Sequence, residues 1–182
     1  MINYNKALKI LSSSKIKIKN EIVLAKNSLS RIASKNIYSP SNHPSANNTA
    51  FDGFAVNSKE TNKLNKKNIK KFKVIRTIAA GDNPNIKNIK KFTTIEVMTG
   101  AIIKKPFDTV IPIEQIKLDL NKKKNKYILI SKKIKKNEYI RYLGSDYKKG
   151  ELVIKKGELI EPSHVLALKT LGIKKVEVKK KI

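Results

Sequence analysis

The residues best suited to chemistry gather in positions 47–56. Asp52 stands directly before Gly53, the first glycine of the chain, and glycine allows backbone conformations and close approaches that other residues resist. The apolar run Phe54–Val56 then predicts a buried strand that would hold the carboxylate of Asp52 at its beginning. An Asx turn leading into a strand would account for the same residues, and the local pattern alone favours that structural interpretation.

A similar arrangement recurs further along the chain. Residues 93–98 are rich in β-branched side chains and lead to Thr99 and Gly100, so a hydroxyl group again precedes a glycine. The sequence thus contains two turns, distant from one another along the chain, that each place a polar side chain beside a glycine.

The formal net charge of +27 comes from 41 basic and 14 acidic residues. Only Arg31, Arg76 and Arg141 are arginines, whereas arginine supplies most bidentate contacts to bases and phosphates. The lysines occur throughout, with many asparagines and isoleucines, a pattern typical of biased genome composition. Aromatic residues make up 6% and tryptophan is absent, which leaves little for stacking bases. We expect no specific nucleic-acid partner, although the charge would concentrate an anionic small-molecule substrate near the protein.

The chain contains no cysteine and only two histidines, His43 and His164. This set offers neither a disulfide framework nor a metal centre built from cysteine or histidine, and no side chain is assigned as a metal ligand. No segment approaches the roughly 18 apolar residues that cross a membrane. We therefore expect a cytoplasmic protein without a membrane partner.

The spacing of apolar residues predicts a mainly β fold with helices at both ends. Asn3 would cap a helix over residues 4–13, and helical spacing predicts a second helix over 25–32, with Arg31 near its C-terminal end. Pro162 would begin a third helix that runs to about residue 171. Strands are expected at residues 54–56, 72–78, 93–98, 108–113, 115–118, 127–130, 151–154 and from 173 onward, with a polar turn at 121–126.

A connection containing Pro40 and Pro44 marks a change in composition. We expect residues 1–44 and 139–182 to form one helix-and-sheet domain, with residues 45–138 inserted as a mostly antiparallel β domain. Both glycine turns fall in the inserted domain.

Four blocks of this chain resemble the N-terminal half of the molybdopterin molybdenumtransferase family, which includes MoeA and gephyrin. They occur in the family's order across nearly the whole chain. The blocks are Ser39–Pro40 through Asn48–Val56, Val97–Ala101, Asp108–Glu114, and Arg141–Asp146 with Gly150 and Leu171–Ile173. The resemblance implies the two-domain fold of bifurcated, coiled β-sheets that the N-terminal region of MoeA adopts.

The resemblance also implies an activity, the insertion of molybdate into adenylylated molybdopterin during molybdenum cofactor biosynthesis. It places Asp52 and Thr99 at the family's catalytic acidic and hydroxyl positions. Asp52 would orient the pterin or a bound cation, while Thr99 and the amide of Gly100 would help hold an oxyanion. Mg²⁺ and molybdate are likewise expected from the family, as is a homodimer.

Asn48 and Gly53 complete the substrate-binding set that the resemblance implies. For Asn48, as for Asp146, a structural role is favoured, in which the side chain fixes a turn by bonding to the backbone.

The chain also departs from the family pattern. Asn47 and Ser145 stand where family members carry carboxylates, and Tyr142 stands in place of a second arginine, which changes the local charge balance. The family's pterin-binding α/β domain and C-terminal β domain are absent from these 182 residues, so the chain alone is expected to be inactive. The alternatives are a non-catalytic assembly module of the same fold and a basic protein that binds nucleic acid without sequence preference.

Overall fold

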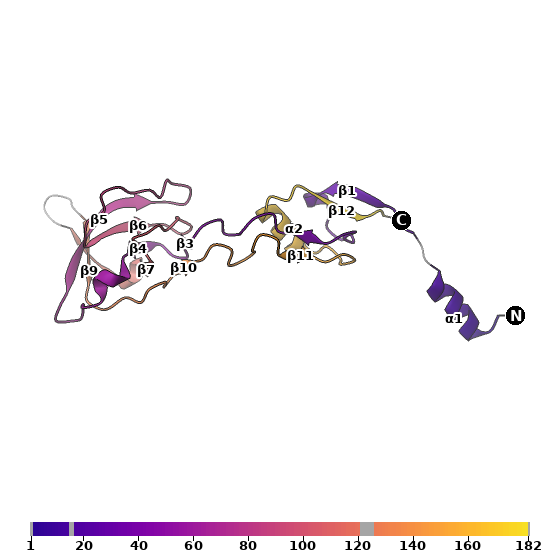
Figure 1. Ribbon diagram of the computed structural model, residues 1–182, viewed down its shortest axis with the longest axis horizontal. Helices are drawn as coiled ribbons and strands as arrows, with labels where there is room; N and C mark the ends of the chain where they lie inside the picture. Colours follow the sequence, from indigo (N-terminus) through magenta and orange to yellow (C-terminus); the bar gives the residue numbers. More distant parts are fainter. Residues whose placement is uncertain (1, 15–16, 121–125, 182) are drawn as a thin grey trace. The chain divides into compact units, whose positions relative to one another are not determined.

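The computed structural model describes residues 2–14, 17–120 and 126–181. The chain divides into two compact units (Figure 1). Residues 1–41 and 149–182 belong to unit 1, and residues 42–148 form unit 2. Each unit has its own hydrophobic core.

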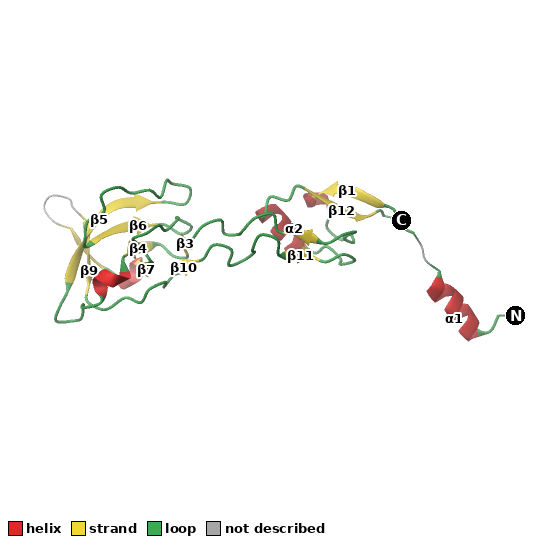
Figure 2. Ribbon diagram, viewed as in Figure 1, coloured by secondary structure: helices red, strands yellow, loops and turns green. Residues whose placement is uncertain are grey.

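Unit 1 combines two small antiparallel sheets with two α-helices (Figure 2). One sheet pairs β1 (Asn20–Leu24) with β12 (Lys175–Lys179), and the other pairs β2 (Ile37–Tyr38) with β11 (Leu152–Ile154). The helices are α1 (Tyr4–Ser13) and α2 (Pro162–Thr170). The core is formed by residues of both sheets, of α2 and of the connecting segments, and it includes Ala33, Ile154, Ile160, Leu168 and Val178.

Both α-helices begin where the sequence supplies a cap. The side chain of Asn3 accepts a hydrogen bond from the Lys6 N–H (2.9 Å) at the start of α1. At α2, Glu161 and His164 form a reciprocal capping box, and Pro162 occupies the first turn, where a helix has no use for its missing N–H. The prediction of a mainly β fold with helices near both ends is confirmed.

Unit 2 is built on a curled six-stranded sheet with the strand order β7-β4-β6-β5-β9-β8 (Figure 1). Its strands are β4 (Gly53–Val56), β5 (Lys70–Ile78), β6 (Thr93–Val97), β7 (Thr109–Pro112), β8 (Lys117–Leu120) and β9 (Lys126–Ile130). Neighbouring strands are antiparallel except β5 and β6, which run parallel. The strands β3 (Asn48–Thr49) and β10 (Ile140–Arg141) form a separate pair, and short 3-10 turns lie at η2 (Ser58–Thr61) and η3 (Ile113–Gln115).

Strand β4 lies between β6 and β7, and all four of its residues are buried (Figure 1). Its side chains alternate between two core clusters: Phe54 and Val56 pack in one, and Ala55 packs in the other. A strand that is covered on both faces has a continuous apolar sequence. The start of β4, where Asp52 and Gly53 lie, is therefore fixed by packing on both faces of the sheet.

The helix expected over residues 25–32 is wrong. Ala25–Asn27 forms only a single 3-10 turn, η1, and Ser30 adopts a left-handed conformation (φ 59°) that a helix cannot include. Ala33 instead pairs with Val178 of β12. Long-range strand pairing therefore overrides the helical spacing of the apolar residues.

Arg31, which was expected near the end of that helix, is buried instead. Its guanidinium forms an ion pair with Glu21 and donates a hydrogen bond to the carbonyl oxygen of Lys179 (2.6 Å). Arg31 thus links the chain before η1 to the end of β12.

Unit 2 extends beyond the expected boundaries of 45–138 at both ends, because residues near those boundaries pair with one another. β10 pairs with β3, and His43 forms a bridge with Tyr147. The expected strand at 115–118 is divided between η3 and β8, and the expected polar turn at 121–126 falls, apart from Lys126, outside the described residues.

Candidate functional site

The two glycine turns meet at one edge of the unit 2 sheet. Asp52 directly precedes β4 and Thr99 follows β6, and these strands are antiparallel neighbours with Gly53 opposite Val97. Oδ1 of Asp52 accepts hydrogen bonds from the Thr99 N–H (2.6 Å) and from the Thr99 hydroxyl (2.8 Å). Both residues are exposed. Strand pairing thus brings together the carboxylate and the alcohol that the sequence keeps far apart.

The hydrogen bonds to Asp52 favour its ionised form. The Thr99 N–H, followed by the Thr99 hydroxyl, lowers the pKa of Asp52 below its ordinary value of 3.8, against a smaller opposing effect of desolvation. Among the described residues, no group donates a hydrogen bond to Oδ2 of the same carboxylate. At neutral pH the pair therefore presents an ionised oxygen to solvent.

The two groups expected to hold an oxyanion, the Thr99 hydroxyl and the Gly100 amide, both donate to acceptors of the protein in this conformation. The only proton of the Thr99 hydroxyl is donated to Asp52, so the Thr99 oxygen offers only lone pairs to a ligand. The Gly100 N–H donates to the carbonyl oxygen of Thr49 (2.9 Å). The site is an acceptor site, which suits a cation or the N–H groups of a ligand rather than a bare anion.

Hydrogen bonds from Thr49 and Ile113 fix the backbone of the turn that carries Asp52. Thr49 is buried, and its hydroxyl donates to the carbonyl oxygen of Phe51 (2.5 Å) and accepts from the Phe51 N–H (3.1 Å). The carbonyl oxygen of Asp52 itself accepts a hydrogen bond from the Ile113 N–H (3.1 Å). The carboxylate is thus positioned before any ligand arrives, which reduces the entropy lost on binding.

The two glycines of the predicted site serve the backbone. Gly53 is buried between β6 and β7, and a Cβ atom there would collide with the carbonyl oxygen of Ile111. Gly100 has φ of 85°, a left-handed conformation that side chains rarely adopt, and an added Cβ would press on Ala80. Glycine at both positions lets the chain turn and pack closely where Asp52 and Thr99 meet.

Asn48 lies in β3, close to these turns in sequence. Its side-chain Oδ1 is buried and has no hydrogen-bond partner among the described residues, so in this conformation neither a substrate nor the turn-fixing role reaches that atom. The amide oxygen that does fix the backbone belongs to Asn47, which accepts from the Leu143 N–H (2.9 Å). Asp146 accepts from the guanidinium of Arg141 (2.6 Å) and so anchors the end of β10.

Sequence reasoning missed an aromatic pair beside Asp52. The rings of Phe51 and Tyr139 meet edge to face, with centroids 5.2 Å apart and planes at 86°. Tyr139 has φ of 57°, which is unusual for an aromatic residue, and its carbonyl oxygen accepts from the Ala50 N–H (3.0 Å). No local sequence pattern could reveal this contact, because all six strands of the sheet lie between Phe51 and Tyr139 in the sequence.

Among the described residues, no three side chains of aspartate, glutamate, histidine or cysteine come together in a way that could hold a metal ion. No helix in the described ranges is long and apolar enough to cross a membrane. A metal bound at the Asp52 turn would therefore need ligands from outside this set.

Comparison with known proteins gives consistent results. Residues 2–172 match the family model of the MoeA N-terminal region (domain I and II). The chain is 32% identical over 157 residues to a molybdopterin molybdenumtransferase of Staphylococcus aureus, with 86% of this chain and 36% of the relative covered. It is 31% identical over 169 residues to the Haemophilus influenzae protein of the same name, with 93% of this chain and 39% of the relative covered.

A solved structure of a molybdopterin biosynthesis MoeA protein from Pyrococcus horikoshii is similar to the whole chain, with a TM-score of 0.85 and 30% identity. The match covers 100% of this chain and 46% of the other. The chain thus spans less than half the length of the proteins that it matches. The matched residues and the shared fold of both units show that this chain belongs to the family of the MoeA N-terminal region.

Proposed function

We propose that this chain provides the acidic part of a molybdopterin molybdenumtransferase site, at which molybdate is inserted into adenylylated molybdopterin. The observation that carries the proposal is the contact between Asp52 and Thr99, which places an ionised, outward-facing carboxylate on a rigid turn. The relatives named molybdopterin molybdenumtransferase supply the class of reaction.

The acceptor character of the pair supports a cation-mediated contact with the substrate. Asp52 and Thr99 turn only oxygen lone pairs outward, and these repel the phosphate oxygens of an adenylylated substrate. Mg²⁺ is usually held by one or two carboxylates together with waters and substrate phosphates. Oδ2 of Asp52 fits as the one protein carboxylate in such a set. The bound ion would neutralise charge on the phosphate groups.

The residues of this chain would act by positioning. Asp52 stays ionised over the neutral pH range because the Thr99 N–H and hydroxyl both bond to it. Thr49 and Ile113 hold the backbone on either side of the carboxylate. This fixed geometry matches the needs of a reaction in which molybdate replaces an adenylate and the barrier falls chiefly through orientation and charge neutralisation.

A complete site needs more than these residues. We propose that a pterin-binding domain, encoded with this chain or separately, supplies the recognition of molybdopterin, and that the working form is a cytoplasmic homodimer. The cleft would then form between the Asp52 turn of one protomer and the pterin-binding domain of its partner.

The test joins this chain to the remaining residues of the Staphylococcus aureus relative and measures molybdenum cofactor formation against Mg²⁺ concentration. We expect Asp52→Asn, which keeps an oxygen acceptor but removes the charge, to raise the Mg²⁺ requirement and reduce the rate. Asp119→Asn is the matched control, because this carboxylate pairs with Lys71 away from the turn. Wild-type activity and Mg²⁺ dependence in Asp52→Asn would contradict the proposal.

A non-catalytic assembly module is the second candidate, and one observation favours it. The two hydrogen bonds from Thr99 to Asp52 would also have a structural role, in which they hold the start of β4 to the end of β6. This structural role needs an oxygen acceptor but no charge. Asp52→Asn would then leave the stability of the fold unchanged, while Asp52→Ala would lower it. Comparing the two variants by thermal unfolding and by cofactor formation separates the candidates.

A further inference from the structure

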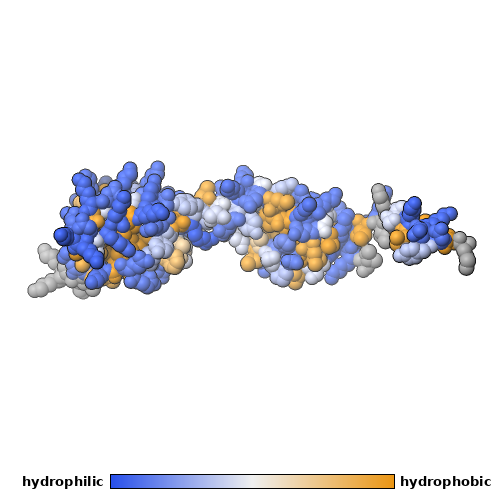
Figure 3. All heavy atoms as spheres, turned by 90° about the horizontal axis from the view of Figure 1, so that it is seen from below, coloured by the Kyte–Doolittle hydropathy of each residue, from blue (hydrophilic) through white to orange (hydrophobic). Residues whose placement is uncertain are grey.

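Large apolar side chains are exposed around the Asp52 turn. Phe51, directly before Asp52, is 49% exposed. β4 pairs with β6 on one side and with β7 on the other, so Met98 and Ile113, which follow β6 and β7, flank Asp52, and both are exposed. Figure 3 shows apolar side chains at the surface of unit 2 among the hydrophilic ones. Exposed apolar side chains that gather at one place, rather than singly, indicate a binding surface.

The exposed patch includes the aromatic pair of Phe51 and Tyr139. The two rings meet edge to face, and Tyr139 is 38% exposed, so each residue keeps part of its surface open to solvent. The edge-to-face contact fixes the direction of both rings, because the edge and the face of an aromatic ring carry opposite partial charges. We call these two rings the aromatic platform.

The backbone holds the aromatic platform in place without burying it. Tyr139 has a left-handed conformation, and its carbonyl oxygen accepts from the Ala50 N–H. Such conformations cost free energy and gather at functional sites. Phe51 lies on the turn that the Thr49 hydroxyl fixes. Neither ring belongs to a core cluster of the chain, so core packing does not account for this arrangement.

The aromatic platform also offers a hydrogen-bond donor. The hydroxyl oxygen of Tyr139 accepts from Nε2 of Gln115 (3.3 Å). No acceptor for its own proton lies among the residues that the structure describes, so that proton is available to a ligand. A flat ring with an acceptor nitrogen on its edge, such as a purine, matches this combination of apolar face and polar edge.

The neighbouring carboxylate narrows the choice to a ring that carries a phosphate. Consecutive Cα atoms are about 3.8 Å apart, so the ring of Phe51 adjoins the place where Asp52 would hold a phosphate through Mg²⁺. In a nucleotide one sugar separates the base from its 5′-phosphate. Adenylylated molybdopterin carries two ring systems, and the proposed function assigns the pterin to the pterin-binding domain. The ring that remains for the aromatic platform is adenine.

We infer that the adenine of adenylylated molybdopterin stacks on the aromatic platform and accepts a hydrogen bond from the Tyr139 hydroxyl. The inference rests on the proposed function and deepens it, because it assigns the part of the substrate that the Asp52 turn does not contact. Phe51 and Tyr139 thereby orient the adenylate that molybdate replaces.

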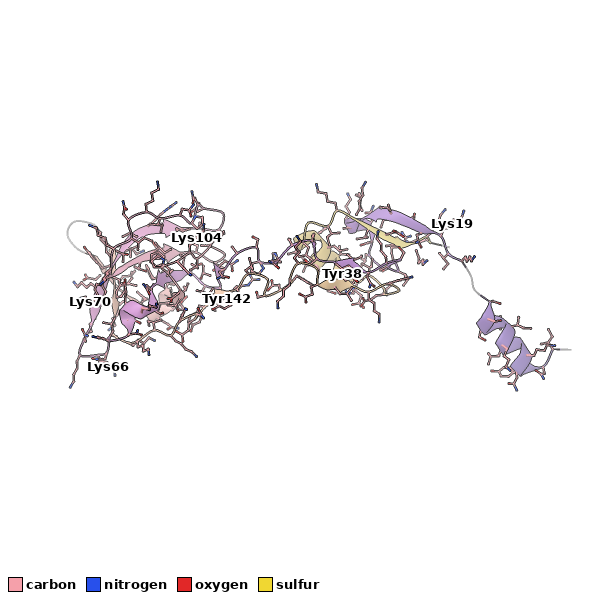
Figure 4. The ribbon with its side chains drawn as sticks, in the orientation of Figure 1. Lys19, Tyr38, Lys66, Lys70, Lys104 and Tyr142 are labelled. Atoms are coloured by element: carbon pink, nitrogen blue, oxygen red, sulfur yellow. The ribbon has the colours of Figure 1, made fainter. Side chains whose placement is uncertain are left out.

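The test compares two ligands of the whole 182-residue chain in the presence of Mg²⁺. ADP carries the base, and ribose 5-diphosphate has the same phosphates and sugar without it. NMR titration gives the affinities and follows the adenine protons H2 and H8, which aromatic ring currents shift upfield on stacking. Phe51→Ala removes a ring of the platform and Phe51→Trp keeps an aromatic side chain. Tyr38→Ala is the matched control, because Tyr38 is an exposed aromatic residue of unit 1 (Figure 4). Circular dichroism checks that each variant is folded.

Stacking on an aromatic side chain is worth about 5- to 150-fold in affinity per base. Because the platform covers only one face of the base, we expect the low end of this range. ADP should bind the unaltered chain about five- to tenfold more tightly than ribose 5-diphosphate does. Phe51→Ala should remove this preference, whereas Phe51→Trp and Tyr38→Ala should keep it. Equal binding of the two ligands by the unaltered chain, or an unchanged preference in Phe51→Ala, would overturn the inference.

Two further variants test the hydrogen bond and the proposed function separately. Tyr139→Phe keeps the ring but removes the donor, so it should weaken ADP about two- to threefold and leave ribose 5-diphosphate unchanged; an unchanged affinity for ADP would overturn the hydrogen bond. Asp52→Asn should weaken both ligands alike, because both lose the cation contact. If Asp52→Asn weakens both but the base preference is missing, the inference alone fails. If the base preference is present and Asp52→Asn changes neither affinity, the cation contact of the proposed function fails instead.

A competition measurement tests which ring the aromatic platform takes. The competitor is 6-hydroxymethylpterin, which has the pterin ring and no phosphate, and we expect it not to displace ADP at equal concentration. Adenosine, which also lacks phosphate, is the matched competitor that should shift the ring protons of Phe51 and Tyr139. Displacement of ADP by the pterin that Phe51→Ala abolishes would assign the platform to the pterin and overturn the assignment to adenine.

Discussion

Replacement of Gly53 by alanine tests how tightly the site turn depends on strand packing. The new Cβ would collide with the carbonyl oxygen of Ile111, and it would lie 2.9 Å from the Ile111 carbonyl carbon and 3.0 Å from Cα of Pro112. These are backbone atoms of β7, so no side-chain rotation can relieve the collision. Overpacking of a core costs about 1–3 kcal/mol, and each ladder hydrogen bond lost as β7 moves away adds about 1 kcal/mol. We expect Gly53→Ala to lower the free energy of unfolding of unit 2 by about 3–5 kcal/mol.

Urea unfolding followed by circular dichroism and tyrosine fluorescence measures the change, and hydrogen exchange locates it. Amides of β4 and β7 should lose protection, while those of the β1–β12 pair in unit 1 keep it. Gly81→Ala is the control, because Gly81 has φ of 90° but open space around it, so alanine there costs only the conformational penalty of about 1–2 kcal/mol.

A smaller loss of stability in Gly53→Ala than in Gly81→Ala would refute the reasoning, because it would mean that β7 can yield at no cost. The same outcome would weaken the argument for a rigid site, since Asp52 directly precedes the residue that β7 holds.

Three further predictions concern the Asp52 turn and strand β4, which follows it. Thr49→Val removes the buried hydroxyl that bonds the backbone of Phe51, and it should lower the unfolding free energy by about 1–2 kcal/mol in urea titrations, with Thr49→Ser close to the unaltered chain. Thr99→Val removes the hydroxyl that donates to Asp52, so NMR titration should show the pKa of Asp52 rising toward 3.8. Because the pKa of Asp52 is lower in the folded state, the stability that ionised Asp52 contributes is complete above the unfolded-state pKa and is lost as pH falls through the folded-state pKa. An Asp52 pKa that Thr99→Val leaves unchanged would contradict the assignment. Phe54→Ala opens a cavity at a fully buried position and should cost about 3–5 kcal/mol by the same unfolding assay, whereas an effect below about 1 kcal/mol would show that the cluster repacks.

Parts of the fold follow from short stretches of sequence. Asn3 caps α1, and Pro162 with its neighbours starts α2, because a cap acts through residues three or four positions away. Strand β4 shows in the sequence as Phe54–Val56, since burial on both faces demands a continuous apolar run. These features depend on neighbours along the chain, so the chain order is sufficient to predict them.

Other parts resist prediction for an equally physical reason. The apolar residues between 25 and 32 have helical spacing, yet Ala33 pairs with β12 and the guanidinium of Arg31 is held by groups far away in sequence. The second boundary of unit 2 lies beyond residue 138 because β10 pairs with β3, a contact between segments far apart in the sequence. Local preference is worth a fraction of a kcal/mol per residue, so tertiary pairing readily overrides it.

The sequence by itself determined the residue types of the candidate site and the family to which its turns are similar, because both are written in the order of the amino acids. Only the tertiary structure decided what those groups can do. The Thr99 hydroxyl donates its proton to Asp52, and the Gly100 N–H donates to the carbonyl oxygen of Thr49. Both donors are therefore engaged within the protein, and the Asp52–Thr99 pair presents oxygen lone pairs to solvent. A hydrogen bond depends on which atoms face one another across paired strands, and that direction exists only once the chain has folded.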